Sequence, residues 1–247
     1  MRYALIFTYN GTNYFGYQIQ KEEKTIQEEI ETILSRILNS PIRIMASGRT
    51  DRGVHALKQV AAFDIDKYID INKLKASLNA LLPKDIRILK VVNVPISFHP
   101  RYSVKRKTYL YIIHIGEDNP FLYNYVYNLH KPLNLNKIRK GMKLLLGEHN
   151  FMNFCTNKEE ESYQECIYSF TLNKHHDYLF FEISGSGFKR YMVRMIIGSL
   201  LAYERDEISL EEIKKRLDNN IRNTICFKAP GCGLYLKDIV YDEEFKL

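Results

Sequence analysis

Apolar residues in the first part of the chain recur with two spacings that follow one another. Tyr3–Tyr9 is rich in aromatic and β-branched residues and runs into Asn10-Gly11, a pattern typical of a strand that ends in a tight turn. Thr25 and Glu28 then have the spacing of a capping box, and apolar residues follow at helical intervals as far as Ile37. The pattern therefore predicts a strand and then a helix with one face in a core.

The same criteria predict elements along the rest of the chain. We expect further strands at Ile42–Ala46, Gln59–Ile65, Ile86–Val94, Thr108–Ile113, Tyr168–Asn173, Tyr178–Ile183 and Gly233–Tyr241. We expect further helices at Asn72–Leu82, Leu135–Leu146 and Phe188–Arg205, and one that begins with the capping box of Ser209 and Glu212. Strands and helices alternate in both halves, so the predicted fold class is α+β with two similar halves.

A change in composition indicates where the halves meet. From Arg101 the sequence becomes basic and aromatic and leads into a strand. We therefore predict an N-terminal α+β subdomain over residues 1–100 and a C-terminal α+β subdomain over residues 101–247. The formal net charge is +7, which favours a polyanionic partner such as a nucleic acid. Many proteins without such a partner carry a similar charge, so composition alone leaves the function open.

Cysteine and hydropathy patterns exclude several classes of protein. The four cysteines, Cys155, Cys166, Cys226 and Cys232, are too few and too irregular for a disulfide scaffold, and the chain has no C-x-x-C or H-E-x-x-H motif for zinc. We expect reduced structural thiols. The longest apolar run, Met195–Tyr203, is too short to span a bilayer, and because Met1 leads directly into strand-like sequence we expect no secretory leader. We therefore expect a soluble, cytoplasmic protein.

One charged loop between two apolar segments could display chemistry. Gly48–Gly53 places the carboxylate of Asp51 between the guanidinium groups of Arg49 and Arg52, with glycines that permit close approach of a ligand. Opposite charges nearby would keep Asp51 ionised, as a nucleophile must be. The same pattern fits a surface turn with local ion pairs, and the charges alone favour that simpler interpretation.

Residues beyond these charges favour a catalytic loop over a surface turn. The loop reads Gly48-Arg49-Thr50-Asp51-Arg52-Gly53-Val54-His55-Ala56 and closely resembles the catalytic motif of the tRNA pseudouridine synthase A (TruA) family. Seven further segments resemble the family in the same order along the chain: Tyr9–Gln18, Leu81–Ile86, Phe98–Ser103, Lys107–Tyr111, Leu145–Phe151, Met192–Gly198 and Gly233–Leu236. The resemblance thus covers nearly the whole chain.

The resemblance implies an isomerase that converts uridine to pseudouridine at one or more of positions 38, 39 and 40 in the anticodon stem-loop of tRNA. Asp51 would be the catalytic carboxylate, with the ribose or the uracil ring as its first target. The product has the same atoms as the substrate, so the reaction needs no cofactor. The chain also has no Walker loop, dinucleotide fingerprint or metal motif.

Three residues of the second half take their roles from the resemblance. Tyr109 matches the active-site tyrosine, whose ring could stack on uracil; the alternative is a core aromatic in a strand. Arg194 matches the arginine that pairs with the catalytic aspartate, and the alternative is a solvated charge on a helix. Leu234 matches an apolar residue that packs on the target base, and a core leucine is an equally good interpretation.

Two arginines of the loop would handle the RNA. Arg49 resembles the arginine that fills the gap left by the flipped base. Arg52 stands where the family often has a small residue or lysine, and we expect it to contact the RNA backbone. The opening motif departs from the family pattern at Asn10, where aspartate is usual, and at Tyr17, where tryptophan is usual. These departures leave the choice of substrate open.

The family fold implies two α+β halves, each a mixed or antiparallel sheet with helices on one face, and a central cleft that binds RNA. Members are typically homodimers, so we expect a homodimer that binds the tRNA anticodon stem-loop without metal, small-molecule cofactor or membrane. Two alternatives stay open: a paralogue that acts on another RNA such as ribosomal RNA, and a non-catalytic RNA-binding protein with the same fold.

Overall fold

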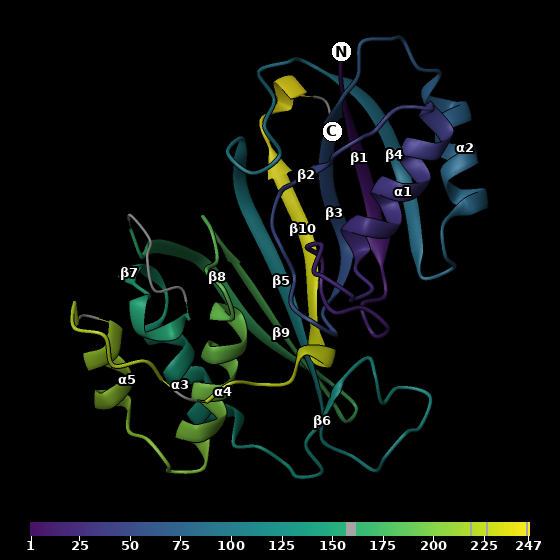
Figure 1. Ribbon diagram of the computed structural model, residues 1–247. Helices are drawn as coiled ribbons and strands as arrows, with labels where there is room; N and C mark the ends of the chain where they lie inside the picture. Colours follow the sequence, from purple (N-terminus) through teal and green to yellow (C-terminus); the bar gives the residue numbers. More distant parts are fainter. Residues whose placement is uncertain (157–161, 218, 226, 246) are drawn as a thin grey trace. The chain divides into compact units, whose positions relative to one another are not determined.

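The computed structural model describes residues 1–156, 162–217, 219–225, 227–245 and 247. The chain divides into two compact units: residues 1–106 with residues 235–247, and residues 107–234 (Figure 1). The division at residue 100 stays a prediction about domains. The compact units differ from it in one respect, because the last residues of the chain belong to the first unit.

The first unit is built on a sheet of mixed direction. Its strand order is β4-β1-β3-β10, and β2 also pairs with β3. The strands are β1 (Arg2–Tyr9), β2 (Met45–Ala46), β3 (His55–Asp64), β4 (Ile86–Val94) and β10 (Leu234–Tyr241). β1 is antiparallel to both β3 and β4, whereas β10 runs parallel to β3.

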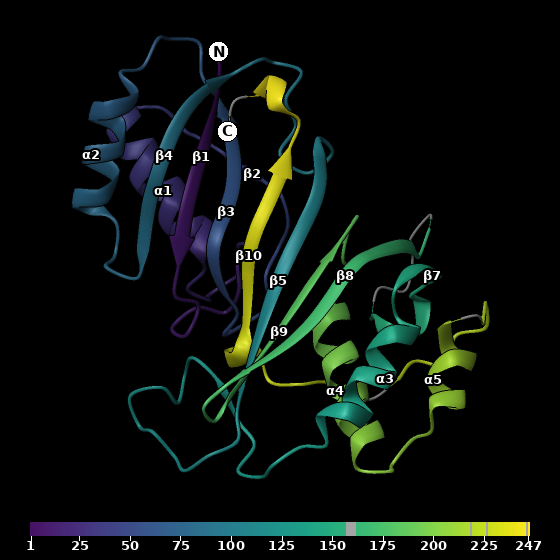
Figure 2. The same cartoon turned by 180° about the vertical axis from the view of Figure 1, so that it is seen from behind.

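Two helices cover one face of this sheet (Figures 1 and 2): α1 (Ile26–Leu38) and α2 (Ile71–Leu81). α1 begins where the capping box predicts, because the Glu28 N–H donates to the Thr25 hydroxyl at 3.4 Å. α2 begins after Asp70, whose carboxylate accepts from the N–H groups of Asn72 and Lys73, both at 3.0 Å. Apolar side chains from strands and helices form the core; Leu5, Phe7, Ile30, Leu34 and Leu78 are fully buried.

The second unit also consists of a sheet with helices. Its strands are antiparallel in the order β5-β9-β8-β7, and β6 pairs in parallel with β5. They comprise β5 (Val104–His114), β6 (Tyr127–Asn128), β7 (Gly147–Asn150), β8 (Gln164–His175) and β9 (Tyr178–Gly185). Its helices α3 (Leu135–Leu144), α4 (Met192–Glu204) and α5 (Leu210–Leu217) lie on one side of these strands (Figures 1 and 2). The α+β fold class with two similar halves is confirmed.

Several predicted elements differ from the structure in their bounds. β3, β5 and β8 each begin four residues earlier than predicted. In two further elements the error has a clear physical reason. Only Met45–Ala46 of the expected strand Ile42–Ala46 is a strand. The Ile42 N–H donates to the Ser35 hydroxyl and the Ile44 N–H donates to the Glu31 carboxylate, both at 2.9 Å, so these N–H groups bond to side chains of α1.

The second error is the start of α4, which we expected at Phe188. The helix begins at Met192, because Tyr191 has a positive φ of 65° and so breaks the helical backbone.

The structure also describes three of the four cysteines and the length of each helix. Among the described residues, no disulfide joins Cys155, Cys166 and Cys232, while Cys226 lies outside these residues. In the described part of the chain, no helix has the length and apolar character needed to cross a membrane.

Candidate active site

The loop between β2 and β3 is fixed by buried polar groups at its base. The Ser47 hydroxyl is 2.5 Å from the Gln59 side-chain oxygen, and the Gln59 amide donates to the Gly48 carbonyl at 3.0 Å. Further along, the hydroxyls of Thr50 and Tyr9 are 2.7 Å apart in a buried hydrogen bond. Burial raises the pKa of Tyr9 to about 12, although the Thr50 hydrogen bond acts in the opposite direction. Tyr9 therefore stays protonated at neutral pH.

The opening segment after β1 packs directly against this loop. A Cβ on Gly11 would lie 2.0 Å from the Val54 carbonyl oxygen, and a Cβ on Gly16 would lie 2.9 Å from the Thr50 carbonyl oxygen. Gly16 also has a φ of +99°, which disfavours any other residue. The Tyr17 N–H donates to the Thr50 carbonyl at 3.0 Å. The opening segment and the charged loop, which are distant in the sequence, therefore pack directly against each other.

This packing displays the charged residues of the loop. Thr50 and Val54 are buried, whereas Arg49 and Arg52 are exposed and Asp51 is half-buried between them. The Val54 N–H donates to the Asp51 carbonyl at 3.1 Å and closes the turn. The guanidinium carbon of Arg52 lies 4.2 Å from the centroid of the Phe15 ring, a cation–π contact. The loop therefore presents a carboxylate flanked by two exposed guanidinium groups.

His55 continues the motif into β3 and is structural in its contacts. Its ring is buried, and its Nδ1 atom accepts from the Gly11 N–H at 3.2 Å. The ring stacks on Tyr235 of β10, with centroids 4.6 Å apart. His55 therefore links the loop, the opening segment and β10.

The two departures from the family motif have clear surroundings. The Asn10 side-chain oxygen accepts from the Thr12 N–H at 3.1 Å and from the Thr12 hydroxyl at 2.7 Å, which an aspartate would also do. Tyr17 is fully buried, and within the part of the chain that the structure describes its hydroxyl has no hydrogen-bond partner. Burial, together with the neighbouring Tyr9 and Glu31, raises the pKa of Tyr17 well above its ordinary value.

Three predicted site residues belong to the first unit and three to the second. In the second unit, Tyr109 lies on β5 opposite Ile183 of β9 and is half-buried. The rings of Tyr109 and Phe188 pack edge to face, with ring centroids 5.0 Å apart and ring planes at 79°. Phe188 therefore restricts the orientation of the Tyr109 ring.

Arg194 lies in the first turn of α4 and is held by the chain that precedes η2 (Gly231–Gly233). Its Nε donates to the Ala229 carbonyl at 2.8 Å, and the Ala229 N–H donates to the Arg194 carbonyl at 3.0 Å. The guanidinium carbon lies 5.2 Å from the centroid of the Tyr191 ring. The side chain is therefore fixed along its length rather than free in solvent.

Leu234 is the first residue of β10 and is buried. The turn before it is held by the Tyr111 hydroxyl, which donates to the Pro230 carbonyl at 2.8 Å. Burial raises the pKa of Tyr111 well above its ordinary value. A Cβ on Gly233 would lie 2.7 Å from the Ile112 carbonyl oxygen, so this close approach of the two segments requires glycine.

One cluster of the second unit was not predicted from the sequence. Tyr191 lies within the helix expected at Phe188–Arg205, but three cations surround the ring of this residue: Arg190, Arg194 and Lys228. The run Lys189-Arg190-Tyr191 is a basic segment with an aromatic residue, which is a signal for this arrangement. Nothing in the sequence connects Lys228 with it.

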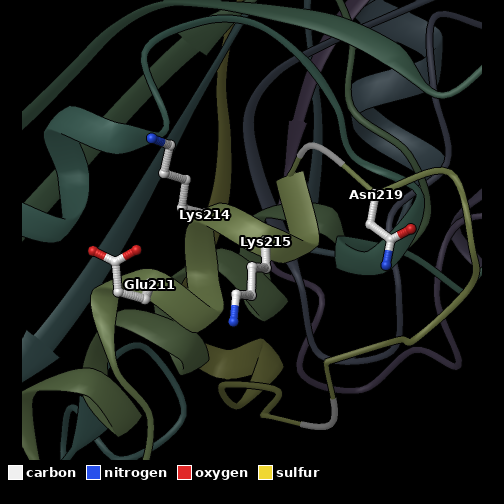
Figure 3. Close-up of a pocket in the computed structure, with 4 residues that line it drawn as sticks. All are labelled: Glu211, Lys214, Lys215 and Asn219. Carbon is white, nitrogen blue, oxygen red and sulfur yellow. The ribbon is translucent and has the colours of Figure 1, made fainter.

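A hollow of about 500 Å³ lies beside α5 and carries no sign of a role in the site. Glu211, Lys214, Lys215 and Asn219 line it. Figure 3 shows that their side chains point in different directions and do not converge. Within the described residues, no group of three or more His, Cys, Asp or Glu side chains could hold a metal ion.

Comparison with known proteins identifies the family. A family model described as tRNA pseudouridine synthase matches residues 5–103 and 142–242. A tRNA pseudouridine synthase A of Anoxybacillus flavithermus is 40% identical over 98% of this chain and 99% of its own length. Proteins of the same name are 37% identical in Mycoplasma genitalium, over 98% of this chain and 99% of the relative, and 40% identical in Borreliella afzelii, over 95% and 96%. The chain belongs to the tRNA pseudouridine synthase family.

Proposed function

We propose that this protein isomerises uridine to pseudouridine in tRNA, at positions 38, 39 and 40 of the anticodon stem-loop, with Asp51 as the catalytic carboxylate. Membership of the family supports an isomerase that acts on tRNA. The observation that carries the role of Asp51 is its display: a half-buried carboxylate between exposed Arg49 and Arg52, on a loop whose neighbours are buried. Such a carboxylate is held in place and still accessible to a nucleoside.

The reaction conserves every atom of the nucleoside. Asp51 attacks the ribose or the uracil ring, and the bond between N1 of uracil and C1′ of ribose breaks. The uracil turns, C5 bonds to C1′ and the bond to Asp51 breaks, which frees the carboxylate; C5 loses its proton and N1 gains one. No electron, phosphate or other group leaves the substrate, which is why no cofactor is proposed.

The second unit supplies the other proposed catalytic groups. Tyr109 stacks on the uracil and assists proton movement at C5, an orientation favoured by its contact with Phe188. Arg194 pairs with Asp51 and orients the carboxylate; its side chain is already held by the Ala229 carbonyl. Leu234 packs against the target base.

Arg49 and Arg52 act on the RNA rather than on the bond that breaks. A base paired in a stem must leave the helix before a carboxylate can reach its ribose, at a cost of roughly a few kcal/mol. Arg49 is exposed and planar, so it can fill the gap in the stack. Arg52 is held over Phe15 and contacts the backbone. We also propose that the protein is a cytoplasmic homodimer, so sedimentation should give twice the mass of the chain.

Replacement of Asp51 tests the central role. We expect Asp51→Asn to lower the rate of pseudouridine formation on the order of a thousandfold or more, while tRNA affinity stays within several-fold, because the carboxylate does covalent work and little anchoring. Tritium release from uridine labelled at C5 measures the rate, and mapping of pseudouridine in tRNA from cells with and without the gene locates the positions.

The matched control is Asp66→Asn, since Asp66 is an exposed carboxylate of the same unit. Asp66→Asn should behave as wild type. A rate for Asp51→Asn within tenfold of wild type would refute the catalytic role. If the pseudouridine that depends on the gene lay outside positions 38 to 40, the proposed positions would be wrong, but the proposed reaction would stand.

A further inference from the structure

The segment that follows β9 reads Ser186-Gly187-Phe188-Lys189 and lies outside the helices and strands. It carries Phe188, whose ring packs edge to face on Tyr109 with the ring centroids 5.0 Å apart. A ring on such a segment can orient a neighbouring ring only if the backbone that carries it is itself fixed. The orientation of Tyr109 therefore depends on the groups that hold this segment in place.

The carboxylate of Glu165, on β8, contacts this segment on both sides of Phe188. Its Oε2 atom accepts from the Ser186 hydroxyl at 2.7 Å, and its Oε1 atom lies 3.3 Å from the Lys189 ammonium. Between these two contacts the carboxylate lies against the backbone, since a Cβ on Gly187 would be 2.7 Å from Oε2 and 2.8 Å from Oε1. Glu165 therefore holds the residues that precede and follow Phe188.

Burial and further hydrogen bonds make these contacts restrictive. The side chains of Glu165 and Lys189 are both largely buried, and a conformation that separates a buried pair leaves two charges without compensation. Ser186 is joined to β8 twice more: its N–H donates to the Cys166 carbonyl and its hydroxyl accepts from the Cys166 N–H, both at 2.9 Å. The two ends of the segment are therefore fixed to β8.

The Phe188 ring has little room to move once its backbone is fixed. A Cβ on Gly185, the last residue of β9, would lie 3.2 Å from the Cζ atom of Phe188, so the ring packs closely on the end of that strand. Gly185 pairs with Lys107 of β5, two residues before Tyr109 on the same strand. The ring of Phe188 is therefore packed between the end of β9 and the ring of Tyr109.

We infer that Glu165 is a positioning residue for Tyr109, an inference that rests on the proposed function. The contacts run from the Glu165 carboxylate to the segment around Phe188, and from the Phe188 ring to Tyr109. Glu165 acts through these residues rather than on the uracil. It keeps the Tyr109 ring in the orientation that stacks on the base, and a small displacement of a positioning group can lower a rate by orders of magnitude.

Single-turnover rates at saturating tRNA test the inference. Glu165→Ala should lower this rate about tenfold while tRNA affinity stays within about twofold, because the orientation of the Tyr109 ring changes and the RNA contacts do not. Glu165→Gln keeps a side-chain oxygen for Ser186 but loses the charge that pairs with Lys189. Its rate should therefore lie between those of wild type and Glu165→Ala.

A double-mutant cycle with Phe188 separates positioning from a general loss of structure. Phe188→Ala alone should lower the rate by about the same factor as Glu165→Ala. In the Phe188→Ala background, Glu165→Ala should lower the rate by less than about twofold more, because the ring through which Glu165 acts is absent. A role in structure alone would give the same factor in both backgrounds.

The matched control is Glu212→Gln, which removes the carboxylate from another ion pair of the same unit, that with Arg216 on α5, and should leave the rate unchanged. Thermal unfolding verifies that each variant is folded, and Glu165→Gln replaces Glu165→Ala in the cycle if the latter is not. A wild-type rate in the Glu165 variant or in Phe188→Ala, or equal factors in both backgrounds, would overturn the inference. Wild type that binds tRNA but forms no pseudouridine would instead overturn the proposed function.

Discussion

At the scale of single residues, Asp51 is held in position by neighbouring residues that take no part in the proposed reaction. Thr50 is buried against Tyr9, and Gly16 allows the opening segment to approach the loop. The charged triplet and its family resemblance can be recognised in the sequence. Gln59, whose amide fixes the base of the loop, cannot, because a polar residue in an apolar strand has no periodic signal. The residues that display Asp51 therefore had to come from the structure.

Arg49 provides a prediction about base flipping. Arg49→Ala should lower the single-turnover rate about tenfold or more on a paired stem uridine, because it removes a stacking plane and a phosphate contact. A mismatch opposite the target uridine lowers the cost of unpairing, so the loss should be smaller there. Single-turnover rates on matched and mismatched stem-loops measure the difference.

The control for this prediction is Arg36→Ala, which removes an exposed arginine of α1 and should leave both rates unchanged. Equal losses on the two substrates in Arg49→Ala would instead indicate that Arg49 positions or charges Asp51.

Two buried tyrosines provide a prediction about stability. The Tyr17 hydroxyl is buried without a partner among the described residues, so Tyr17→Phe should raise the free energy of unfolding by about 1 kcal/mol. The Tyr9 hydroxyl bonds to Thr50, so Tyr9→Phe should lower it by about 1 kcal/mol. Urea unfolding at neutral pH measures both. A loss of stability in Tyr17→Phe would mean that its hydroxyl has a partner, such as a buried water.

At the scale of elements, the sequence predicts best where strong local signals mark both ends. β4 has the predicted bounds, Ile86–Val94, because Pro83 ends the preceding helix and Pro95 follows the strand. The start of α4 could not be predicted, because the apolar spacing continues through Tyr191 and only the positive φ of that residue interrupts the helix. The strand expected at Ile42 failed because its N–H groups bond to side chains of α1.

The start of α2 provides a prediction at this scale. Asp70 accepts from two N–H groups of the first turn, so Asp70→Ala should lower the free energy of unfolding by about 1 kcal/mol. Asp70→Asn keeps the side-chain acceptor and should cost only a few tenths of a kcal/mol. Urea unfolding of the two variants gives the difference. Equal losses would show that the charge of Asp70, rather than its hydrogen bonds, supports the helix.

At the scale of the whole molecule, the residues proposed for catalysis and RNA contact are divided between the two units. The first unit contains Asp51 and the two arginines of its loop, and the second contains Tyr109, Arg194 and Leu234. Three of these six residues, Tyr109, Arg194 and Leu234, could be singled out only through the family resemblance, because a tyrosine in a strand, an arginine on a helix and a buried leucine each have an ordinary structural interpretation. The contact of Lys228 with the Tyr191 ring could not be predicted from the sequence, since the two residues are far apart in the chain.

The reaction proposed for the whole protein should need neither a metal ion nor a nucleotide. The isomerisation exchanges one bond to C1′ for another and has no redox or group-transfer step, so the proposed carboxylate, tyrosine and arginine are sufficient for it. Protein treated with a chelator and then desalted should therefore keep its full rate on tRNA, measured by tritium release with polyamine present to hold the RNA fold. Metal can support the substrate as well as the protein, so RNA folding must be monitored in parallel. If activity were lost while the tRNA stayed folded, and one divalent ion restored it, the metal would act in the chemistry and the mechanism through Asp51 alone would be wrong.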